Sequence, residues 1–120
     1  MLNVMIDHIG ELAVVECEGR IVHREAAVKL RRAVTSQADA RIVVLELSEV
    51  HAIEGGGLGM LVFLRRWAKD KNIRFLLFNP SKSVRSGLKR IRSISEFYIP
   101  SMDEMMALLA YASSRHALAA

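Results

Sequence analysis

Apolar residues along this chain change their spacing several times, as they do where strands and helices alternate. The segment Glu11–Cys17 is rich in β-branched residues and predicts a strand, and Asn3–Asp7 predicts a shorter strand that pairs with it. Gly19 breaks the strand pattern. Over Arg24–Gln37 the apolar residues recur at helical spacing instead, which predicts an amphipathic helix.

The middle of the chain repeats this change from strand to helix. Arg41–Leu47 is apolar at consecutive positions, which is typical of a strand buried on both faces at the centre of a parallel sheet. We expect a loop over Ser48–Gly56 and a second helix over Leu58–Lys69. Ile73–Phe78 then predicts another buried strand.

A third helix is predicted to begin directly after Ser81, whose hydroxyl can accept a hydrogen bond from a free amide of the first turn. Val84, Leu88 and Ile91 are spaced to form its apolar face. Gly87 lies inside this helix and weakens it by about 1 kcal/mol relative to alanine.

The last part of the chain predicts a short strand at Phe97–Ile99 and a final helix. Ser101 and Glu104 have the spacing of a capping box at the start of that helix. Its apolar residues at helical spacing are Met102, Met105, Met106 and Leu109. Adaptable methionine surfaces do bind partners, but the spacing favours packing against the core.

The predicted element order is β-β-α-β-α-β-α-β-α. Strands that alternate with helices form parallel pairs, and the first two strands form an antiparallel hairpin. We therefore predict an α/β fold with a mixed, mostly parallel sheet of four or five strands and about four helices. A chain of 120 residues is expected to form one domain, which we place at residues 1–110, with residues 111–120 as an extension of the last helix or a tail.

The composition is that of an ordinary globular domain, with 52% hydrophobic and 25% charged residues. Cys17 is the single cysteine, which excludes an intramolecular disulfide and a cysteine-based metal site. No apolar run reaches the ~18 residues that indicate a membrane span. The first residues also lack the pattern of a signal peptide. The expected location is the cytoplasm.

One stretch carries most of the excess positive charge of a chain whose formal charge is +4. Its cations are Lys82, Arg85, Lys89, Arg90 and Arg92, with no carboxylate before Glu96. Such a stripe can attract an acidic protein, nucleotide phosphates or nucleic acid, although a solvated helix face is the simpler interpretation. Because no aromatic residue interleaves with these cations, we expect no direct nucleic-acid partner.

The segment Glu54–Gly59 contains four glycines between a predicted central strand and a predicted helix. Successive glycines let backbone amides approach a ligand or a partner closely. No Lys-Ser/Thr pair follows them, which excludes a P-loop, and Met60 occupies the third glycine position of the dinucleotide-binding fingerprint. A tight connection without a ligand is the structural alternative, although it does not explain the entropic cost of four glycines.

No motif in the sequence indicates catalysis. The scattered histidines are His8, His23, His51 and His116, and none shares metal-ligand spacing with another histidine or a carboxylate. His51 lies near enough to Glu54 to pair with it, although a lone histidine in a loop is more often a surface residue. Cys17 is expected to be a packed residue and not a nucleophile. We therefore predict no enzyme activity, no metal and no cofactor.

The segment Leu47–Leu61 resembles the signature of STAS domains, and more specifically that of bacterial anti-sigma-factor antagonists. The family has a strand ending in D-L-S-x-V, followed by x-x-I-D-S-S-G-L-G-x-L, where this chain has L-S-E-V-H-A-I-E-G-G-G-L-G-M-L. The later segment Leu76–Arg85, followed by Phe97, is similar to the second half of the family. The resemblance spans Glu11–Leu109 and implies the STAS fold.

The chain departs from the family at the residues that carry its switch. Family members have Asp at the position of Glu54 and Ser-Ser at the positions of Gly55 and Gly56. In the family, a partner that is both a serine kinase and an anti-sigma factor phosphorylates the second of these serines, and the dephosphorylated form binds that partner and frees the sigma factor. Gly56 has no hydroxyl group, so the chain is not phosphorylatable at this position.

The resemblance implies a non-enzymatic protein-binding module that docks an anti-sigma factor or kinase and so regulates transcription. The residues expected to contact the partner lie in and beside the glycine turn: Ser48, His51, Glu54, Gly55, Gly56, Gly57 and Leu58. Two alternatives stay open, namely a STAS scaffold subunit of a signalling or lipid-transport complex and a sensor of a small anionic ligand or nucleotide. The sequence also leaves a homodimer open.

Overall fold

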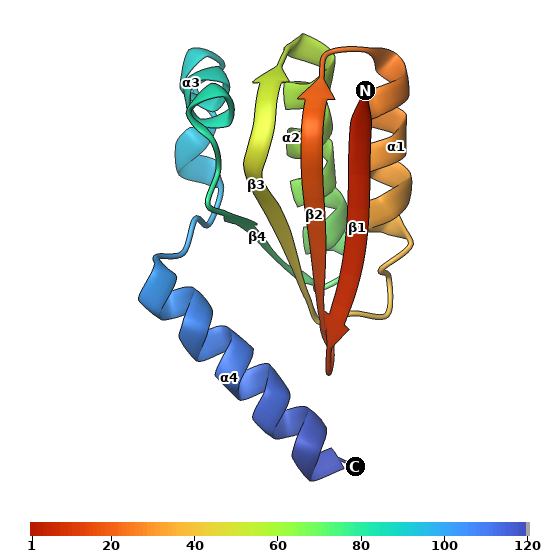
Figure 1. Ribbon diagram of the computed structural model, residues 1–120, viewed down its shortest axis with the longest axis vertical. Helices are drawn as coiled ribbons and strands as arrows, with labels where there is room; N and C mark the ends of the chain where they lie inside the picture. The colour runs from red at the N-terminus through yellow and green to blue at the C-terminus, as the bar shows by residue number, and fades with distance from the viewer. Residues whose placement is uncertain (120) are drawn as a thin grey trace.

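A single sheet organises the molecule in the computed structural model, which describes the backbone of residues 1–119 and the side chains of residues 1–114. Within this part of the chain, four strands lie in the order β1-β2-β3-β4 (Figure 1). They are β1 (Leu2–Ile9), β2 (Leu12–Ile21), β3 (Ile42–Ile53) and β4 (Arg74–Phe78). β1 is antiparallel to β2, whereas β2, β3 and β4 are parallel to one another. The predicted α/β fold with a mixed, mostly parallel sheet is confirmed.

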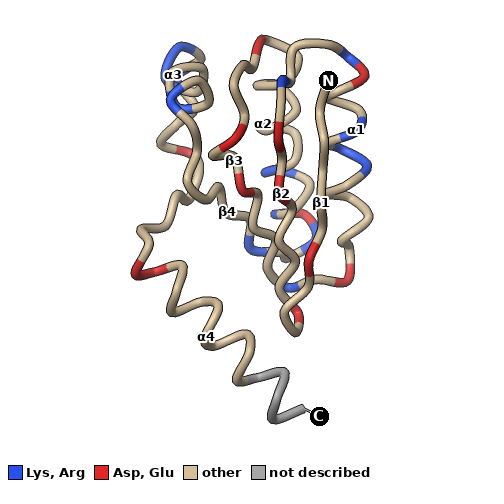
Figure 2. The backbone as a smooth tube through the Cα atoms, in the orientation of Figure 1, with Lys and Arg blue, Asp and Glu red and all other residues tan. Residues whose placement is uncertain are grey.

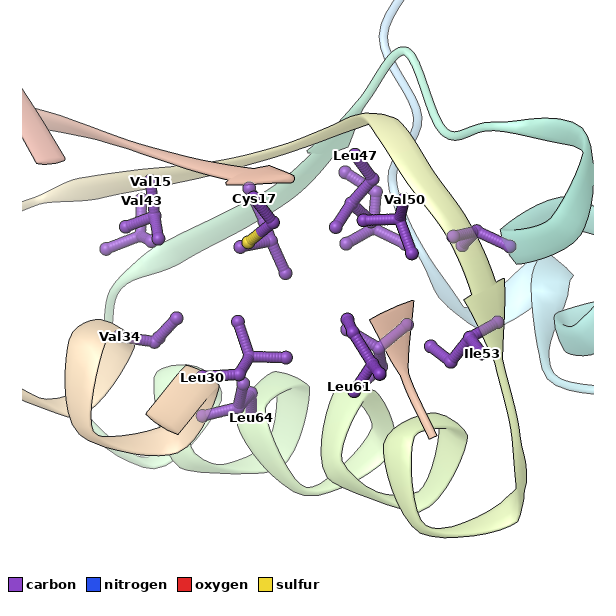
Figure 3. Close-up of a cluster of buried hydrophobic side chains, with 14 of the residues drawn as sticks. Val15, Cys17, Leu30, Val34, Val43, Leu47, Val50, Ile53, Leu61 and Leu64 are labelled. Carbon is purple, nitrogen blue, oxygen red and sulfur yellow. The ribbon is translucent and has the colours of Figure 1, made fainter. Parts of the chain in front are cut away.

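Helices pack on the sheet, and two of them cover the same face. The described helices are α1 (Arg24–Thr35), α2 (Gly55–Asp70), α3 (Lys82–Arg90) and α4 (Met102–Ala119), with a 3₁₀ turn η1 (Ile94–Glu96). Figure 1 shows α1 and α2 side by side behind the strands. Figure 3 shows Cys17 and Val50 of the sheet pointing towards Leu30 and Leu61 of these helices. Full burial of an aliphatic side chain of this kind contributes about 1.5–3 kcal/mol, so this layer is the main core.

A second, smaller apolar cluster lies on the opposite face of the sheet. Leu12, Val44 and Leu76 point away from the main core and pack with Met105 and Ala112 of α4. Successive residues of a strand face opposite sides, so the consecutive apolar residues of β3 fill both clusters. The first half of β3 is therefore buried on both faces, as predicted.

β3 is longer than predicted and includes most of the expected loop Ser48–Gly56. Its register with β2 shifts twice, and each shift adds one residue to β3. The buried side chains that follow Leu47 are therefore Val50 and Ile53, three residues apart instead of two. These bulges hide the two-residue period by which a strand is recognised. β2 likewise continues through Gly19, which lies at the second shift.

α2 begins at Gly55 and not at Leu58 as the sequence predicted. The N–H groups of the first residues of a helix have no intrahelical partner, so a helix can begin at residues of low helix propensity. The glycines therefore form the first turn of α2 instead of a loop before it.

The predicted strand Phe97–Ile99 is reduced to a single bridge between Tyr98 and Leu76. The N–H of Leu77 donates to the carbonyl of Tyr98 at 3.0 Å, and η1 directly precedes this segment. Because Pro100 follows two residues later and carries no N–H, the pairing does not extend further.

Both predicted helix caps are confirmed. The hydroxyl oxygen of Ser81 accepts from the N–H of Val84 at 3.3 Å. In the capping box, the N–H of Glu104 donates to the Ser101 hydroxyl at 3.1 Å, and the N–H of Ser101 donates to the Glu104 carboxylate at 2.9 Å. The Ser101 N–H, together with the Tyr98 hydroxyl, lowers the pKa of the Glu104 carboxyl below its ordinary value.

The predicted apolar face of α4 is only partly buried. Met105 is 2% exposed, but Met102 and Met106 are 60% and 58% exposed, so the prediction that these two pack in the core is wrong. α4 meets the sheet along a narrow stripe, which leaves its other sides to solvent. The helix continues past residue 110 to Ala119, and residue 120 lies outside the described residues, so the domain boundary at 110 stays a prediction. Within the described chain, no helix combines the length and apolarity needed to cross a membrane.

Ser81→Ala should destabilise the fold by about 1 kcal/mol, because the N-cap of α3 is lost. The Ser81 hydroxyl also donates to the carbonyl of Val50 at 2.6 Å, which adds to the expected cost. Ser95→Ala is the matched control, since Ser95 is exposed and makes no side-chain hydrogen bond to another described residue. Urea unfolding measures both free energies, and equal values for the two variants would contradict the role of the cap.

Candidate functional site

The predicted docking turn joins the carboxyl end of β3 to the first turn of α2. Glu54 is the N-cap residue of α2 and has an extended backbone. Its N–H donates to the carbonyl of Ile21 in β2 at 3.2 Å, and its own carbonyl accepts from the N–H of Leu58 at 2.9 Å. The turn is therefore anchored to the two central strands and to the helix that follows.

The four glycines of the turn fall into two groups. A Cβ added to Gly57 would lie 2.6 Å from the carbonyl oxygen of Ile21, so only glycine lets α2 approach the strand end this closely. A Cβ added to Gly55, Gly56 or Gly59 would meet no atom within 4 Å. These three residues are exposed and leave the outer surface of the turn without side chains.

No side chain caps the N-terminus of α2. Glu54 makes no capping hydrogen bond, and the first turn contains no acidic residue. The free N–H groups and the helix dipole give this end a partial positive charge. The exposed N–H groups of the turn can therefore donate hydrogen bonds to acceptor atoms of a partner.

The predicted docking residues of the turn differ in their access to a partner. Glu54, Gly55 and Gly56 are exposed. Gly57 and Leu58 are buried, and Leu58 is only 3% exposed within the main core. In this conformation Gly57 and Leu58 fix the position of α2, and the accessible surface belongs to the other three residues.

The two predicted docking residues of β3 occupy different places. His51 is exposed, in line with the surface role that is more common for a lone histidine, and it lines a groove together with Glu54. Its Nε2 lies 3.9 Å from a carboxylate oxygen of Glu49, in place of the alternative pairing with Glu54. Ser48 is half-buried, and its hydroxyl donates to the carboxylate of Glu46 at 2.9 Å. The structure thus brings His51 to the turn, whereas Ser48 is held by a neighbour on its own strand.

A groove that was not predicted from the sequence has a volume of about 430 Å³ and lies between the end of β3 and α3. Four residues of α3 line it: Lys82, Ser83, Ser86 and Arg90. The Ser83 hydroxyl donates to the carbonyl of His51 at 2.9 Å, which ties α3 to β3. A Cβ on Gly87 would lie 2.8 Å from Cδ2 of Leu58, so a glycine permits this close approach. The position of Gly87 inside an amphipathic helix was the sequence feature that indicated a close approach of α3 to a neighbouring element.

Cys17 is the remaining candidate for reactive chemistry, and its side chain is buried. Desolvation raises the pKa of the Cys17 thiol to about 12, and the Glu46 carboxylate adds a smaller effect in the same direction. Cys17 is 2% exposed in the main core, which confirms the prediction of a packed residue. Among the residues with described side chains, no three His, Cys, Asp or Glu groups come together as a metal site.

The chain belongs to the STAS domain family, because a profile of that family matches residues 3–102. No curated protein matches the chain by sequence. The family assignment agrees with the observed strand order and with the turn between β3 and α2.

Solved structures show the same fold. The anti-sigma factor antagonist SpoIIAA in its unphosphorylated form gives a TM-score of 0.72 at 13% identity, and the match covers 90% of this chain and 96% of that chain. An anti-sigma factor antagonist from Mycobacterium paratuberculosis gives 0.74 at 18% identity, covering 92% and 95%. The structure of SLC26A9 gives 0.70 at 11% identity, covering 88% of this chain and 21% of that longer one. At these identities the likeness concerns the fold.

Gly57→Ala should destabilise the protein by about 1–3 kcal/mol, because its new Cβ overlaps a backbone oxygen that cannot move freely. Gly56→Ala is the matched variant and should stabilise α2 by up to about 1 kcal/mol, since its Cβ meets open space. Chemical denaturation measures both. A destabilised Gly56→Ala variant would show that position 56 is sterically constrained.

The Cys17 thiol should resist an aromatic disulfide reagent at pH 8 in the native protein and react quickly after unfolding, because the reactive species is the thiolate. The thiol pKa is about 12 in the folded protein against an ordinary value of 9.0, so the unfolded chain loses this proton first. The contribution of the protonated Cys17 thiol to the stability of the fold is therefore intact below pH 9.0 and declines as the pH rises towards about 12. Cys17→Ala should remove both effects, and rapid labelling of the native thiol would disprove its burial.

Proposed function

We propose that this chain is a non-enzymatic protein-binding module of the anti-sigma-factor antagonist type. It docks an anti-sigma factor or a related serine kinase through the Glu54–Gly59 turn and the start of α2, and thereby regulates transcription in the cytoplasm. The observation that carries this proposal is the exposed first turn of α2, in which Gly55 and Gly56 face open space and no side chain caps the helix. Fold relatives described as anti-sigma factor antagonists support this kind of partner.

The glycine at position 56 determines how such docking is regulated. A phosphoserine there would add a charge of roughly −2 at the end of α2. Enclosing that charge in a close-fitting interface would require costly desolvation. Gly56 cannot be phosphorylated, so the turn gains no phosphate charge and stays close-fitting under all kinase conditions. Docking is then permanently competent or controlled elsewhere on the molecule.

A scaffold role in a larger signalling or lipid-transport complex is the second candidate. It is favoured by the missing hydroxyl at Gly56 and by the occurrence of the same fold within the longer chain of SLC26A9. Affinity purification from the native host separates the two candidates. A kinase-like anti-sigma factor supports the antagonist, whereas a permease or an assembly of several STAS chains supports the scaffold.

A sensor of small anions or nucleotides is tested separately. A ligand that binds only the folded state raises the melting temperature of the protein. The informative pair of results is a nucleotide that raises the melting temperature and an affinity purification with this chain that recovers no anti-sigma factor. This pair of results would favour the sensor over both docking functions.

Gly56→Asp should weaken binding of the recovered anti-sigma factor at least about tenfold, because it places a permanent charge in the interface. The variant should remain folded, since an acidic side chain near a helix N-terminus is favourable and Gly56 faces open space. Ala38→Asp is the control, because Ala38 is exposed in the connection between α1 and β3. Isothermal titration calorimetry measures both affinities, and an unchanged affinity for Gly56→Asp would remove the turn from the interface.

The variant Gly56→Ser tests the same position by phosphorylation. Its hydroxyl restores the acceptor that the family uses, and the space around position 56 accommodates it. Incubation with the recovered kinase and ATP should phosphorylate this variant at residue 56 and lower its affinity. In the natural chain, a phosphate mapped to Ser48 or Ser81 would contradict the view that docking escapes this kinase.

A further inference from the structure

Positive charge is concentrated on α3, beside the docking turn. Figure 2 shows Lys and Arg residues on α3 and Asp and Glu residues along β2 and β3. The five cations of this region are all exposed: Lys82, Arg85, Lys89, Arg90 and Arg92. The ion pairs found among the described side chains are Arg41–Glu11 and His51–Glu49, so none of the five has a carboxylate partner there.

The stability of α3 does not explain these cations. Lys82 begins the helix and Arg85 follows three residues later, at the end where the helix dipole disfavours positive charge. Arg85 and Lys89 are also like charges four residues apart, which repel each other on a helix surface. Lys89 and Arg90 in the last turn are favourable to the dipole, so the unfavourable charge lies in the first half of α3.

Two of the cations face the groove at the turn. Lys82, Ser86 and Arg90 are four residues apart on one side of α3, and all three line the groove that also contains His51 and Glu54. The hydroxyl of Ser86 makes no hydrogen bond to another described residue. Two cations and a free donor on one wall are suited to carboxylate groups.

The packing of α3 holds this wall in place. The Ser81 and Ser83 hydroxyls bind the carbonyls of Val50 and His51, and Gly87 lies against Leu58 of α2. The contact with Leu58 joins α3 to the helix that carries the turn. The turn, the groove and α3 therefore form one fixed and continuous surface.

We infer that the docking surface extends from the turn across the groove onto α3, and that the partner places an acidic protein segment there. This inference rests on the proposed function for the turn, and it adds the chemistry of the partner. A protein is favoured over nucleic acid because the carboxylate of Glu54 borders the groove. A protein segment can place its carboxylates beside Lys82 and Arg90 and a neutral or basic residue beside Glu54, whereas a nucleic acid carries a phosphate at every nucleotide. The residues of α3 also include no aromatic side chain on which a base could stack.

Binding of a ten-residue glutamate peptide to the ¹⁵N-labelled full-length chain tests the inference. Amide resonances of residues 51–56 and 82–92 should shift, and the apparent affinity should fall about tenfold or more between low and high salt. The double variant Lys82→Glu with Arg90→Glu should lose these shifts. Arg31→Glu with Arg32→Glu on α1 makes the same change in charge at exposed residues and should retain them.

Three outcomes would overturn the inference. Shifts spread equally over α1 and α3 would mean unspecific attraction, and no shifts would mean a solvated helix face. Tighter binding of a single-stranded DNA of equal charge would assign the surface to nucleic acid. Because the peptide assay needs no anti-sigma factor, its failure is distinguishable from a failure of the Gly56→Asp experiment, which tests the turn.

Discussion

The approach of α2 to the end of β2 at Gly57 is the constraint on which the arrangement of the site depends. Gly57 lies so close to the carbonyl of Ile21 that any side chain at this position would displace the helix. The next residue, Leu58, supports α3 through its contact with Gly87, so the position of α3 depends on the same approach. Two glycines therefore set the spacing between three elements, and the groove between β3 and α3 follows from that spacing.

The order of strands and helices could be predicted from the sequence, because local amphipathic spacing reports which faces are buried. The extent of β3 could not, because its bulges place Leu47, Val50 and Ile53 at a spacing that matches no regular strand. The glycine turn could be singled out as the candidate site, but its helical conformation depends on packing against Ile21, which no local pattern encodes. The groove was missed because its walls, His51 and Lys82, are distant in sequence and meet only through tertiary contacts.

Gly57 is the one glycine of the turn that the packing requires, so the other three need a separate explanation. Gly55, Gly56 and Gly59 have room for a side chain, yet each lowers helix stability by up to about 1 kcal/mol relative to alanine. The fold thus accounts for Gly57 alone. Under the proposed function the remaining three serve the outer surface, where the absence of side chains lets another molecule approach the backbone of α2.

Positive charge predominates on this surface. The uncapped end of α2 contributes a partial positive charge, and Lys82 and Arg90 contribute full charges across the groove. A phosphate at position 56 would be drawn to these cations and would offset part of their field. With glycine at that position, the cations remain available to a partner, and the carboxylate of Glu54 is the opposing charge within the groove. A turn without a phosphate beside a basic helix therefore favours an acidic partner surface at every state of kinase activity.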